Sequence, residues 1–398
     1  MSTANTKYTK GTKNKLPDGW RWVRLEEVCT LRTGGTPSKS DPANFGGDTK
    51  WLVSGDIHQG EIFDCAGRIS KRGMANSNAA LLPPDCVLIA LNGQGKTRGT
   101  VALLSVAATC NQSLVALIPR DRDKLLPRIL LRQLQMRYQE LRDLTGDSHR
   151  SGLSMRVLKR LKVALPPPAE QERIVGVLDE QMAAMEKARV AAEARLEAAV
   201  ALPAAIGRET LRNGQKRRYA LGDCLTEVRN GVGPDWSKYP VLGATRNGLA
   251  PAKEGVGKTP ERYKLVDPVT VFYNPMRILL GSIAMVDEGD STGITSPDYV
   301  VVKGRAGVLD TRWFYYWFRS GQGAHLIASL SRGAVRERIL FNRLATAEIE
   351  LPDYELQVRA SERMRQVKPV VESITDEIKT INILPSVILR EVFAGAVL

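Results

Sequence analysis

The sequence predicts an α+β protein: two tandem globular α/β domains, each followed by a long helix, with the two helices packed as an antiparallel coiled coil. Three observations predict this fold class. Strand-like segments recur in the same order in both halves of the chain, each half closes with an apolar helical pattern, and both patterns hold a proline at the matching place. Such an arrangement relates the two halves by a pseudo-twofold axis.

The repeat is clearest in a predicted β-hairpin. The segment VLIALNGQGKTRGTVALL, which starts at Val87, aligns without a gap with VTVFYNPMRILLGSIAMV, which starts at Val269. Each copy reads as a β-branched strand, a polar turn and a second apolar strand, a pattern typical of a hairpin. The copies lie about 180 residues apart, so we interpret the chain as one unit of about 190 residues written twice.

Three further pairs of segments keep the same order along the chain. They are RLEEVCTLRTG with ALGDCLTEVRNG, VLKRLKVALP with RLATAEIELP, and LPAAIGRETL with LPSVILREVF, which begin at Arg24 and Ala220, Val157 and Arg343, and Leu202 and Leu384. The repeat divides the chain into a disordered basic arm (1–15), a first globular domain (16–166), a first helix (167–215), a second globular domain (216–352) and a second helix (353–398).

Each predicted helix carries an apolar seam with the 3,4 spacing of a coiled coil. The first seam consists of Val175, Leu178, Met182, Met185, Ala192, Leu196 and Ala199, and the second of Val367, Val371, Ile374, Ile378, Ile381, Ile388 and Val392. Such an apolar seam must be buried from water against another apolar surface. The seam of the other helix in the same chain is the simplest partner. A helix of about 35 to 40 residues is roughly 55 to 60 Å long, enough to hold two globular domains apart. Pro203 and Pro385 predict that both helices kink or restart.

The amino-acid composition limits the kinds of partner that the protein is expected to bind. The 398 residues include 57 Lys and Arg against 43 Asp and Glu, a net charge of +14, and the pI is about 9.6. This excess favours an anionic partner, a nucleic acid or an acidic membrane. The apolar runs fall short of the roughly 20 residues of a membrane span, and the arm has no apolar core like that of a signal peptide, so we expect a soluble, cytoplasmic protein.

Cysteine and histidine usage argues against a metal site. The five cysteines are far apart and never form a CxxC pair, and no two of the three histidines lie within helical reach of each other. A disulfide framework, a thiolate zinc site and a zinc-protease motif are therefore not expected.

The turn GQGKTRG (93–99) is the strongest candidate for a contact with an anion. Its glycines let a backbone approach closely, Lys96 suits a phosphate, Thr97 adds a hydroxyl, and Gln94 or Arg98 suits a base edge. A phosphate-binding loop of the nucleotide-hydrolase type is not supported, because Ala90 stands where that motif needs glycine and a strand, not a helix, follows. A solvated turn is the alternative.

Other polar loops suit the same kind of groove, with plain surface solubility as the alternative. The candidate DNA-binding residues on them are Ser38, Lys39, His149, Arg150, Arg229, Arg246, Asn247, Arg277, Arg332 and Arg336.

Three further segments, one aromatic and two motif-like, are not expected to carry a function. Six consecutive aromatic residues at 313–318 go around all sides of a helix, so most of them belong to the core rather than to a base-stacking surface. The segments NPMR, from Asn274, and SPDY, from Ser296, resemble weakly the loop with which amino-methyltransferases hold their target base. Both lack its second proline, and no glycine-rich cofactor turn accompanies them.

Taken in order, several motifs resemble the specificity subunit of type I restriction and modification systems. They are LPDGWRWVRLEEV (16–28), GDI (55–57), GQGKTRG (93–99), NQ (111–112) and LPPPAEQERIV (165–175). The resemblance implies a non-catalytic reader of double-stranded DNA with two target-recognition domains, each reading one half of a split sequence. The helices would dock two modification (methyltransferase) subunits, and restriction subunits would complete the complex.

The same resemblance implies that this chain holds no cofactor or metal, while S-adenosylmethionine, ATP and Mg belong to partner subunits. The residues expected in the coiled coil or at a partner are Gln171, Arg173, Val175, Leu178, Met182, Met185, Leu196, Ile374, Ile378, Ile381 and Ile388. In the second half only Gln357 and Arg359 stay in register with the motif of Gln171 and Arg173.

Because the two halves differ wherever their loops match, we expect an asymmetric target with two different half-sites and an unread spacer. Two other classes of protein stay open: a self-sufficient DNA methyltransferase or nuclease, and a coiled-coil scaffold that binds protein only. No membrane contact is expected.

Overall fold

The computed structural model describes residues 16–93, 95–144, 153–331 and 338–393. The chain forms two compact units. Unit 1 comprises Met1–Val190 and Lys379–Leu398, and unit 2 comprises Ala191–Ile378.

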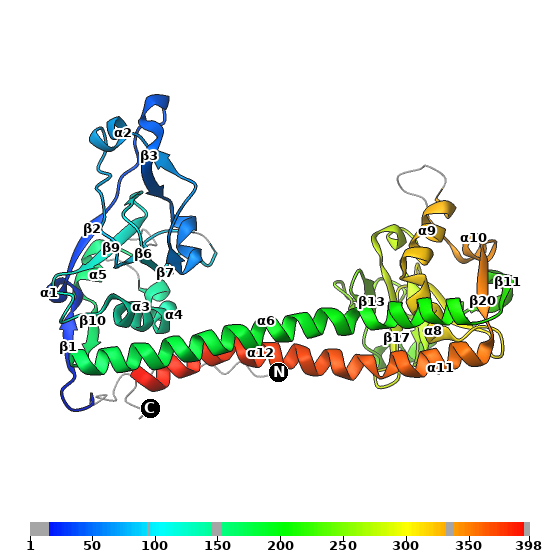
Figure 1. Ribbon diagram of the computed structural model, residues 1–398. Helices are drawn as coiled ribbons and strands as arrows, with labels where there is room; N and C mark the ends of the chain where they lie inside the picture. Colours follow the sequence, from blue (N-terminus) through cyan, green and yellow to red (C-terminus); the bar gives the residue numbers. More distant parts are fainter. Residues whose placement is uncertain (1–15, 94, 145–152, 332–337, 394–398) are drawn as a thin grey trace. The chain divides into compact units, whose positions relative to one another are not determined.

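Unit 1 is built on a five-stranded sheet (Figure 1). Its order is β2-β9-β6-β7-β4, and all neighbours are antiparallel except β4 and β7. The strands are β2 (Cys29–Thr33), β9 (Leu114–Pro119), β6 (Cys86–Ala90), β7 (Val101–Leu104) and β4 (Glu61–Ile62). Every residue of β6 and β7 is buried, which agrees with their continuous apolar sequence.

Smaller elements cover this sheet. A three-stranded sheet contains β5 (Arg68–Ile69), β3 (Phe45–Leu52) and β8 (Thr109–Cys110), and a second pair joins β1 (Arg21–Arg24) to β10 (Lys162–Leu165). The helices and short turns are α1 (Leu25–Val28), α2 (Lys71–Ala75), α3 (Pro127–Met136), α4 (Tyr138–Asp143), α5 (Met155–Arg160), η1 (Pro42–Asn44) and η2 (Ser54–Gln59). Helix α3 packs on β6 and β7.

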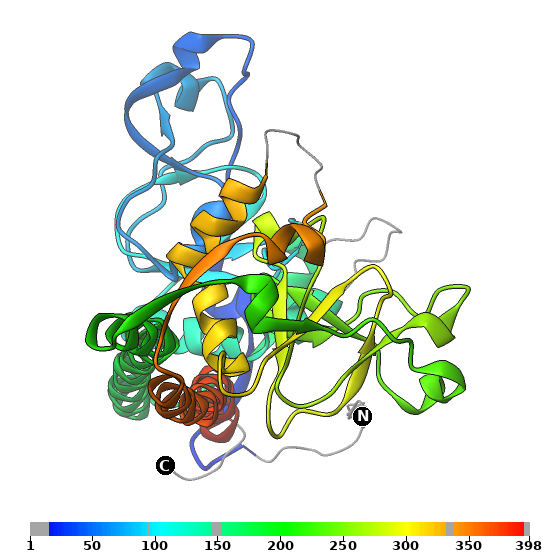
Figure 2. The same ribbon diagram turned by 90° about the vertical axis from the view of Figure 1, so that its right-hand side faces the viewer.

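Unit 2, coloured green to orange in Figure 2, is built on a four-stranded sheet. The order of its strands is β12-β19-β16-β17. These strands are β12 (Leu225–Glu227), β19 (Val300–Gly304), β16 (Thr270–Tyr273) and β17 (Ile283–Val286). Three further pairs join β13 (Leu242–Thr245) to β14 (Gly248–Pro251), β15 (Lys264–Val266) to β18 (Gly293–Thr295), and β11 (Lys216–Ala220) to β20 (Glu348–Pro352). The helices and turns are α7 (Leu221–Cys224), α8 (Thr311–Phe318), α9 (Gly321–Leu330), α10 (Phe341–Ala345), η3 (Gly233–Lys238), η4 (Pro260–Arg262) and η5 (Ile278–Leu280).

The internal repeat appears as one strand order in both units. The run β2-β9-β6-β7 corresponds to β12-β19-β16-β17, and the pair β1–β10 corresponds to β11–β20. The predicted hairpins are confirmed as β6–β7 and β16–β17, which are antiparallel pairs. Helix α8 packs on β16, β17 and β19 as α3 packs on β6 and β7. The aromatic run lies on α8 and is mostly core, since Trp313, Phe314 and Phe318 are fully buried.

Three helices make up the long helical segments: α6 (Pro168–Asn213), α11 (Tyr354–Arg365) and α12 (Val367–Phe393). Of the two expected alternatives at Pro203 and Pro385, a kink or a restart, the restart is excluded, because α6 and α12 continue through these residues. Pro203 is buried, so packing within unit 2 offsets the hydrogen bond that a helix loses at proline. The second segment breaks instead at Gln366, because the ring of Pro369 disfavours a helical carbonyl four residues earlier.

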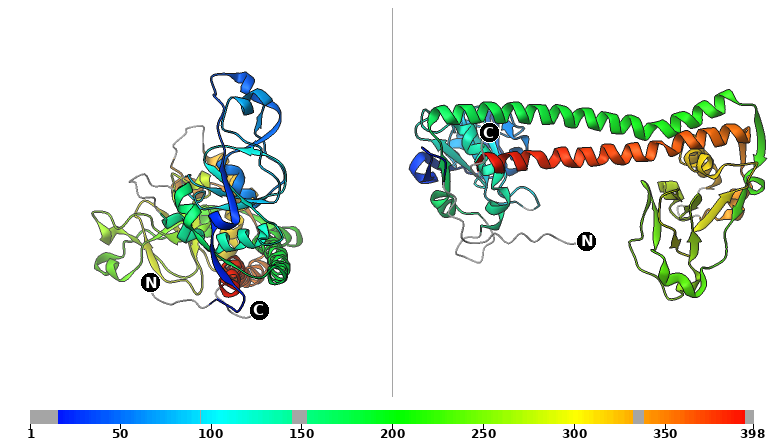
Figure 3. Two further views of the ribbon diagram at one scale, coloured as in Figure 1. Left: turned by 90° about the vertical axis from the view of Figure 1, so that its left-hand side faces the viewer. Right: turned by 90° about the horizontal axis from the view of Figure 1, so that it is seen from below.

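The apolar seams are buried or half-buried along both helices. In unit 1, Leu178 of α6 shares a core cluster with Leu389 and Val392 of α12, and the two helices lie side by side (Figure 3). In unit 2, Ile206 of α6 shares a cluster with Met364 of α11. Across that unit, α6 and the α11–α12 segment run antiparallel, as two ion pairs between them show. Arg195 pairs with Glu377, and Glu209 pairs with Arg363.

Candidate nucleic-acid interface

The turn between β6 and β7, residues 91–100, is called tip 1. Its backbone closes on itself, because Gly99 N donates to Ala90 O at 2.9 Å and Thr100 N donates to Thr97 O at 3.0 Å. Helix α4 supports it, since the Tyr138 hydroxyl donates to Lys96 O at 2.7 Å. The described part of tip 1 is therefore attached to α4 of unit 1.

The side chains of tip 1 divide into anchors and free groups. The Arg98 guanidinium donates to Arg142 O at 2.7 Å and is half-buried, so this residue holds the turn and is poorly placed to read a base. The Thr97 hydroxyl lies 3.0 Å from His58 Nε2. Lys96 is exposed, and its ammonium group has no partner among the described residues. Beside the turn is a hollow of about 370 Å³ whose lining includes His58, Lys96 and Tyr138.

The turn between β16 and β17, residues 274–282, is called tip 2. It is a compact 3-10 turn in which Gly281, with φ +81°, closes the chain through a 2.8 Å bond from its N–H to Ile278 O. Helix α8 is followed at once by Arg319, whose guanidinium donates to Ile283 O and, at 2.7 Å, to Arg246 O. A hollow of about 610 Å³ lies beside this tip.

Tip 2 differs from tip 1 in what it exposes. Three of its side chains are large, apolar and at least half exposed: Met276 (53%), Leu279 (52%) and Leu280 (71%). The predicted residues Arg246 and Arg277 are exposed next to them. The surface of unit 2 at this hairpin is thus an apolar centre with two arginines at its rim.

In both units a second loop returns to the base of the tip. Leu153 N donates to Leu91 O at 3.3 Å in unit 1, and Ile339 N donates to Pro275 O at 3.1 Å in unit 2. Leu153 and Ile339 each come shortly after a segment that lies outside the described residues. Five of the predicted DNA-binding residues also lie outside the described residues: Gln94, His149, Arg150, Arg332 and Arg336.

The remaining predicted loop residues are exposed. Ser38 and Lys39 lie between β2 and β3, where Ser38 O accepts from Asn44 Nδ2 within the same loop. Arg229 pairs with Glu227 at 2.6 Å, so its charge is already balanced. Asn247 lies in the turn between β13 and β14, next to Arg246.

Gln171 at the start of α6 is fully buried, and all its hydrogen bonds lie inside unit 1. Its carbonyl accepts from Leu126 N at 2.9 Å, and its amide donates to Lys124 O and Pro166 O. The side chain thus attaches α6 to the globular part of unit 1. Arg173 is exposed and paired with Glu170 at 2.8 Å.

Gln357 in α11 makes the same set of bonds in unit 2 and is also fully buried. It accepts from Asp310 N at 2.9 Å and donates to Val308 O and Pro352 O. The two glutamines therefore attach equivalent helices to equivalent globular parts.

A cluster of ion pairs accompanies each attachment. In unit 1, Arg128 lies between Glu61, at 3.1 Å, and Asp179 of α6, at 3.4 Å, while Arg132 pairs with Asp179 at 2.6 Å.

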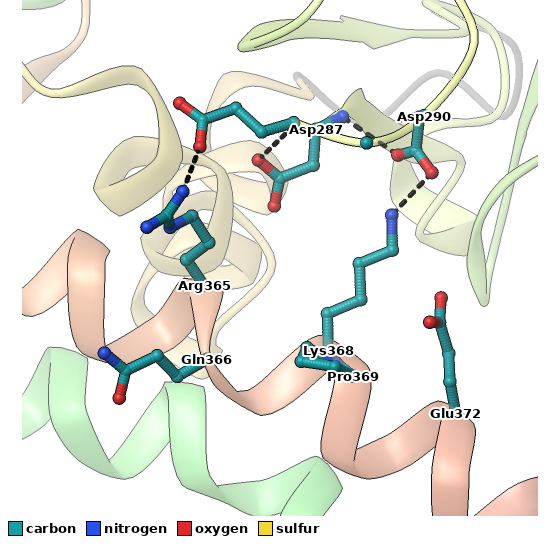
Figure 4. Close-up of a pocket in the computed structure, with 9 residues that line it drawn as sticks. Asp287, Asp290, Arg365, Gln366, Lys368, Pro369 and Glu372 are labelled. Carbon is teal, nitrogen blue, oxygen red and sulfur yellow. Dashed lines mark hydrogen bonds and ion pairs between the residues drawn. The ribbon is translucent and has the colours of Figure 1, made fainter.

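In unit 2 the loop after β17 contacts α11 and the start of α12 (Figure 4). Arg365 pairs with Glu288 at 2.6 Å, and Lys368 pairs with Asp290. Arg312 pairs with Asp287 and is buried. Burial opposes the charge on Arg312, but the hydrogen bond to Asp287 and its negative charge outweigh burial and raise the pKa of Arg312.

Sequence reasoning missed a group of exposed apolar side chains on the long helices. In unit 1 these are Ile383, Leu384 and Val387 of α12, and in unit 2 they are Val200 and Leu202 of α6 and Val370 of α12. They lie off the predicted seams, and only the excess of apolar residues over what a two-helix seam needs could have revealed them.

The five cysteines are free and buried. Burial raises the pKa of the Cys29, Cys86 and Cys110 thiols to about 12. Within the described residues no group of three or more His, Cys, Asp or Glu side chains could hold a metal ion. None of the described helices combines the length and the apolar character that crossing a bilayer requires.

Comparison with known proteins gives a consistent result. Residues 17–193 match the family described as the type I restriction modification DNA specificity domain. The MjaIX specificity subunit of a type I restriction enzyme from Methanocaldococcus jannaschii is 24% identical over 176 residues. That alignment covers 44% of this chain and 40% of the relative, so the chain matches less than half the length of that protein.

Two solved structures share the fold over almost the whole chain. One is a chain from a study of complex assembly and conformational transition in the type I R-M system, with a TM-score of 0.67, 18% identity, and coverage of 96% of this chain and 100% of that one. The other is the HsdS subunit from Thermoanaerobacter tengcongensis, with a TM-score of 0.58, 19% identity, and coverage of 96% and 98%. Both show the same mixed α/β fold with a long C-terminal helix.

The fold defines the structural class, a mixed α/β protein with a long C-terminal helix. Residues 17–193 match the family of type I restriction modification DNA specificity domains, which agrees with the resemblance seen in the sequence. The relatives are specificity subunits, which are non-catalytic.

Proposed function

We propose that this chain is the DNA specificity subunit of a type I restriction-modification complex and reads an asymmetric, two-part target. One observation carries the proposal: the same strand order presents a hairpin tip in each unit, but the two tips carry different chemistry. A repeated frame with variable contacts suits two readers of two different half-sites. Target-recognition domains at 16–166 and 216–352, with helices at 167–215 and 353–398 in an antiparallel coiled coil, complete the proposal.

Electrostatics supports DNA as the ligand. The chain carries a net charge of +14, and Lys96, Arg246 and Arg277 are exposed at the two tips. Cations that no acidic side chain neutralises are free to displace the counterions of phosphate groups, which is the main source of affinity for DNA. In this proposal Lys96 contacts phosphate, while Arg98 keeps tip 1 in place.

The helices offer a surface for partner subunits. Exposed apolar side chains that are grouped on one element mark contact sites, and Val200 (60%) and Ile383 (59%) are the most exposed of those on α6 and α12. We propose that two modification subunits dock there and that restriction subunits join the assembly. S-adenosylmethionine, ATP and Mg act on those partners, and methyl transfer is their chemistry.

Methylome sequencing of cells with and without this gene tests the proposal. Deleting the gene should abolish methylation at one split, asymmetric sequence, and exchanging residues 216–352 for the same region of another such subunit should change only one half-site. A palindromic target, or a change in both half-sites, would contradict it.

Docking has its own test. Val200→Glu and Ile383→Glu should abolish co-purification of the modification subunit, because each places a charge in an apolar contact. The matched control is Ser373→Glu, at an exposed polar position of α12. If both apolar variants still bind the modification subunit, the contact lies elsewhere.

The purified chain distinguishes the other two classes of protein. Methylation with S-adenosylmethionine alone, or DNA cleavage with magnesium alone, would identify a self-sufficient enzyme. A chain without DNA affinity at any salt concentration would identify a protein-only scaffold.

A further inference from the structure

Tip 2 exposes an apolar surface where tip 1 exposes a polar one. Leu279 and Leu280 belong to the turn η5, and Met276 precedes it by two residues. Single exposed apolar side chains are normal on any surface, but a group of three on one turn indicates a contact with another apolar group.

The turn is rigid. Ile278 is buried under it, Met276 N donates to Asn274 Oδ1 at 3.0 Å, and the Ser282 hydroxyl donates to Ala244 O at 2.6 Å. The leucines are therefore presented in a fixed position, and a ligand that meets them pays little entropy for ordering the loop.

Cations surround this apolar surface. A Cβ placed on Gly281 would lie 3.6 Å from Arg246 Cγ, so the Arg246 side chain lies directly beside the turn. Arg277 is part of the turn itself, and neither guanidinium group bonds to any other group that the structure describes. The matching ligand combines an apolar group with neighbouring anionic groups.

Double-stranded DNA offers one such place. In the major groove the only apolar group on a base edge is the C5 methyl of thymine, and phosphates flank it on both strands. We infer that tip 2 reads a T·A pair by packing Leu279 and Leu280 on the thymine methyl, with Arg246 and Arg277 on neighbouring phosphates. This inference rests on the proposed function and adds the kind of base pair that unit 2 selects.

The test uses the full chain and a duplex carrying its target. Each thymine in the half-site assigned to unit 2 by the domain exchange is replaced, one at a time, by deoxyuridine, which removes only the methyl group. At least one replacement should weaken binding about fourfold, the equivalent of roughly 0.8 kcal/mol for one buried methyl group.

A double-mutant cycle then assigns the contact to the turn. Leu280→Ala should weaken binding to the thymine duplex about fourfold and bind the thymine and uracil duplexes equally. Because Leu280 is 71% exposed, this variant should fold like the natural chain. The matched control is Leu202→Ala, which removes an exposed leucine of α6 in the same unit and should keep the discrimination between thymine and uracil.

The possible outcomes distinguish a failure of this inference from a failure of the proposed function. If the chain binds its target specifically but the half-site has no thymine, or uracil is bound as well as thymine, the inference is wrong and the proposed function stands. If Leu280→Ala releases the modification subunit and keeps the thymine discrimination, tip 2 is a protein contact. A chain with no sequence-specific binding overturns both.

Discussion

Tip 1 and tip 2 occupy the same position in the same strand order, and their supports are alike. A tyrosine and an arginine one helical turn apart stand behind each tip, Tyr138 with Arg142 and Tyr315 with Arg319, and in both pairs the guanidinium carbon lies 5.4 Å from the ring centroid. What the tips expose differs, a lysine among glycines in one and leucines among arginines in the other. The comparison teaches that the residues that support each tip and the residues that each tip exposes can vary independently. Four experiments follow, in order of expected effect.

The largest effect is expected at the ion pairs close to the points where the long helices are attached. Arg312 and Asp287 are 7% and 6% exposed, whereas Arg132 and Asp179 of unit 1 are 15% and 34% exposed. Arg312→Met should lower the free energy of unfolding by about 3 to 5 kcal/mol because it leaves a buried carboxylate without a partner, and Arg132→Met by about 1 kcal/mol. Urea denaturation measures the loss, and hydrogen exchange assigns it to a unit. Equal losses would show that burial is not what distinguishes the two pairs.

The buried glutamines should behave alike. Gln171→Leu and Gln357→Leu each leave one backbone N–H and two carbonyls unpaired, so each should lower the free energy of unfolding by about 3 kcal/mol. Gln366→Leu, at an exposed position, is the control and should stay within about 0.5 kcal/mol of the natural chain. A difference above about 1 kcal/mol between the two buried sites would break their equivalence.

A smaller effect is expected at tip 1. Lys96→Glu should weaken DNA binding about tenfold and reduce the slope of log affinity against log salt by about one unit, with little change of sequence preference, because it removes the phosphate contact proposed for Lys96. Lys162→Glu in β10, an exposed lysine of the same unit outside tip 1, is the control. An unchanged slope would remove Lys96 from the interface.

The smallest effect is expected at the thiols. Burial holds the pKa of Cys29, Cys86 and Cys110 at about 12 and raises that of Cys224 to about 11, so these groups are protonated at pH 7 to 8. A thiol reagent should label none of the five cysteines quickly in the native chain and all of them in denaturant. Rapid native labelling of one would show that its unit opens locally.

The sequence alone predicted the parts of the fold that depend on short-range patterns. The hairpins follow from alternation around Asn92 and Asn274, and the seams follow from helical spacing. It did not predict the role of Arg98, because the partner of that guanidinium is the carbonyl of Arg142, which is brought near only by the folded sheet. The continuous helix at Pro203 was missed for the same reason, since a local rule for proline does not include the packing around it.

The exposed groups were the least predictable. A pattern of residue types located the loops that carry Lys96 and Arg277, but it gave equal weight to Arg229, whose charge is balanced by Glu227 two residues away. The sequence did not predict that Leu279 and Leu280 are exposed, because an apolar residue next to a strand normally belongs to the core. Their exposure depends on the direction in which η5 turns, and that direction is set by the bonds of Asn274 and Ser282.

The bonds of Gln171 and Gln357 explain how two units with such different tips can share one scaffold. Each glutamine bonds only to main-chain atoms: one N–H, which every residue except proline can supply, and two carbonyls, which every residue can supply. The residues at those places differ between the units, Lys124 against Val308 and Leu126 against Asp310, yet the joint is unchanged. A connection of this kind places almost no restriction on the side chains around it. Mutations can therefore change the exposed surface of a globular part without loosening its attachment to the long helix.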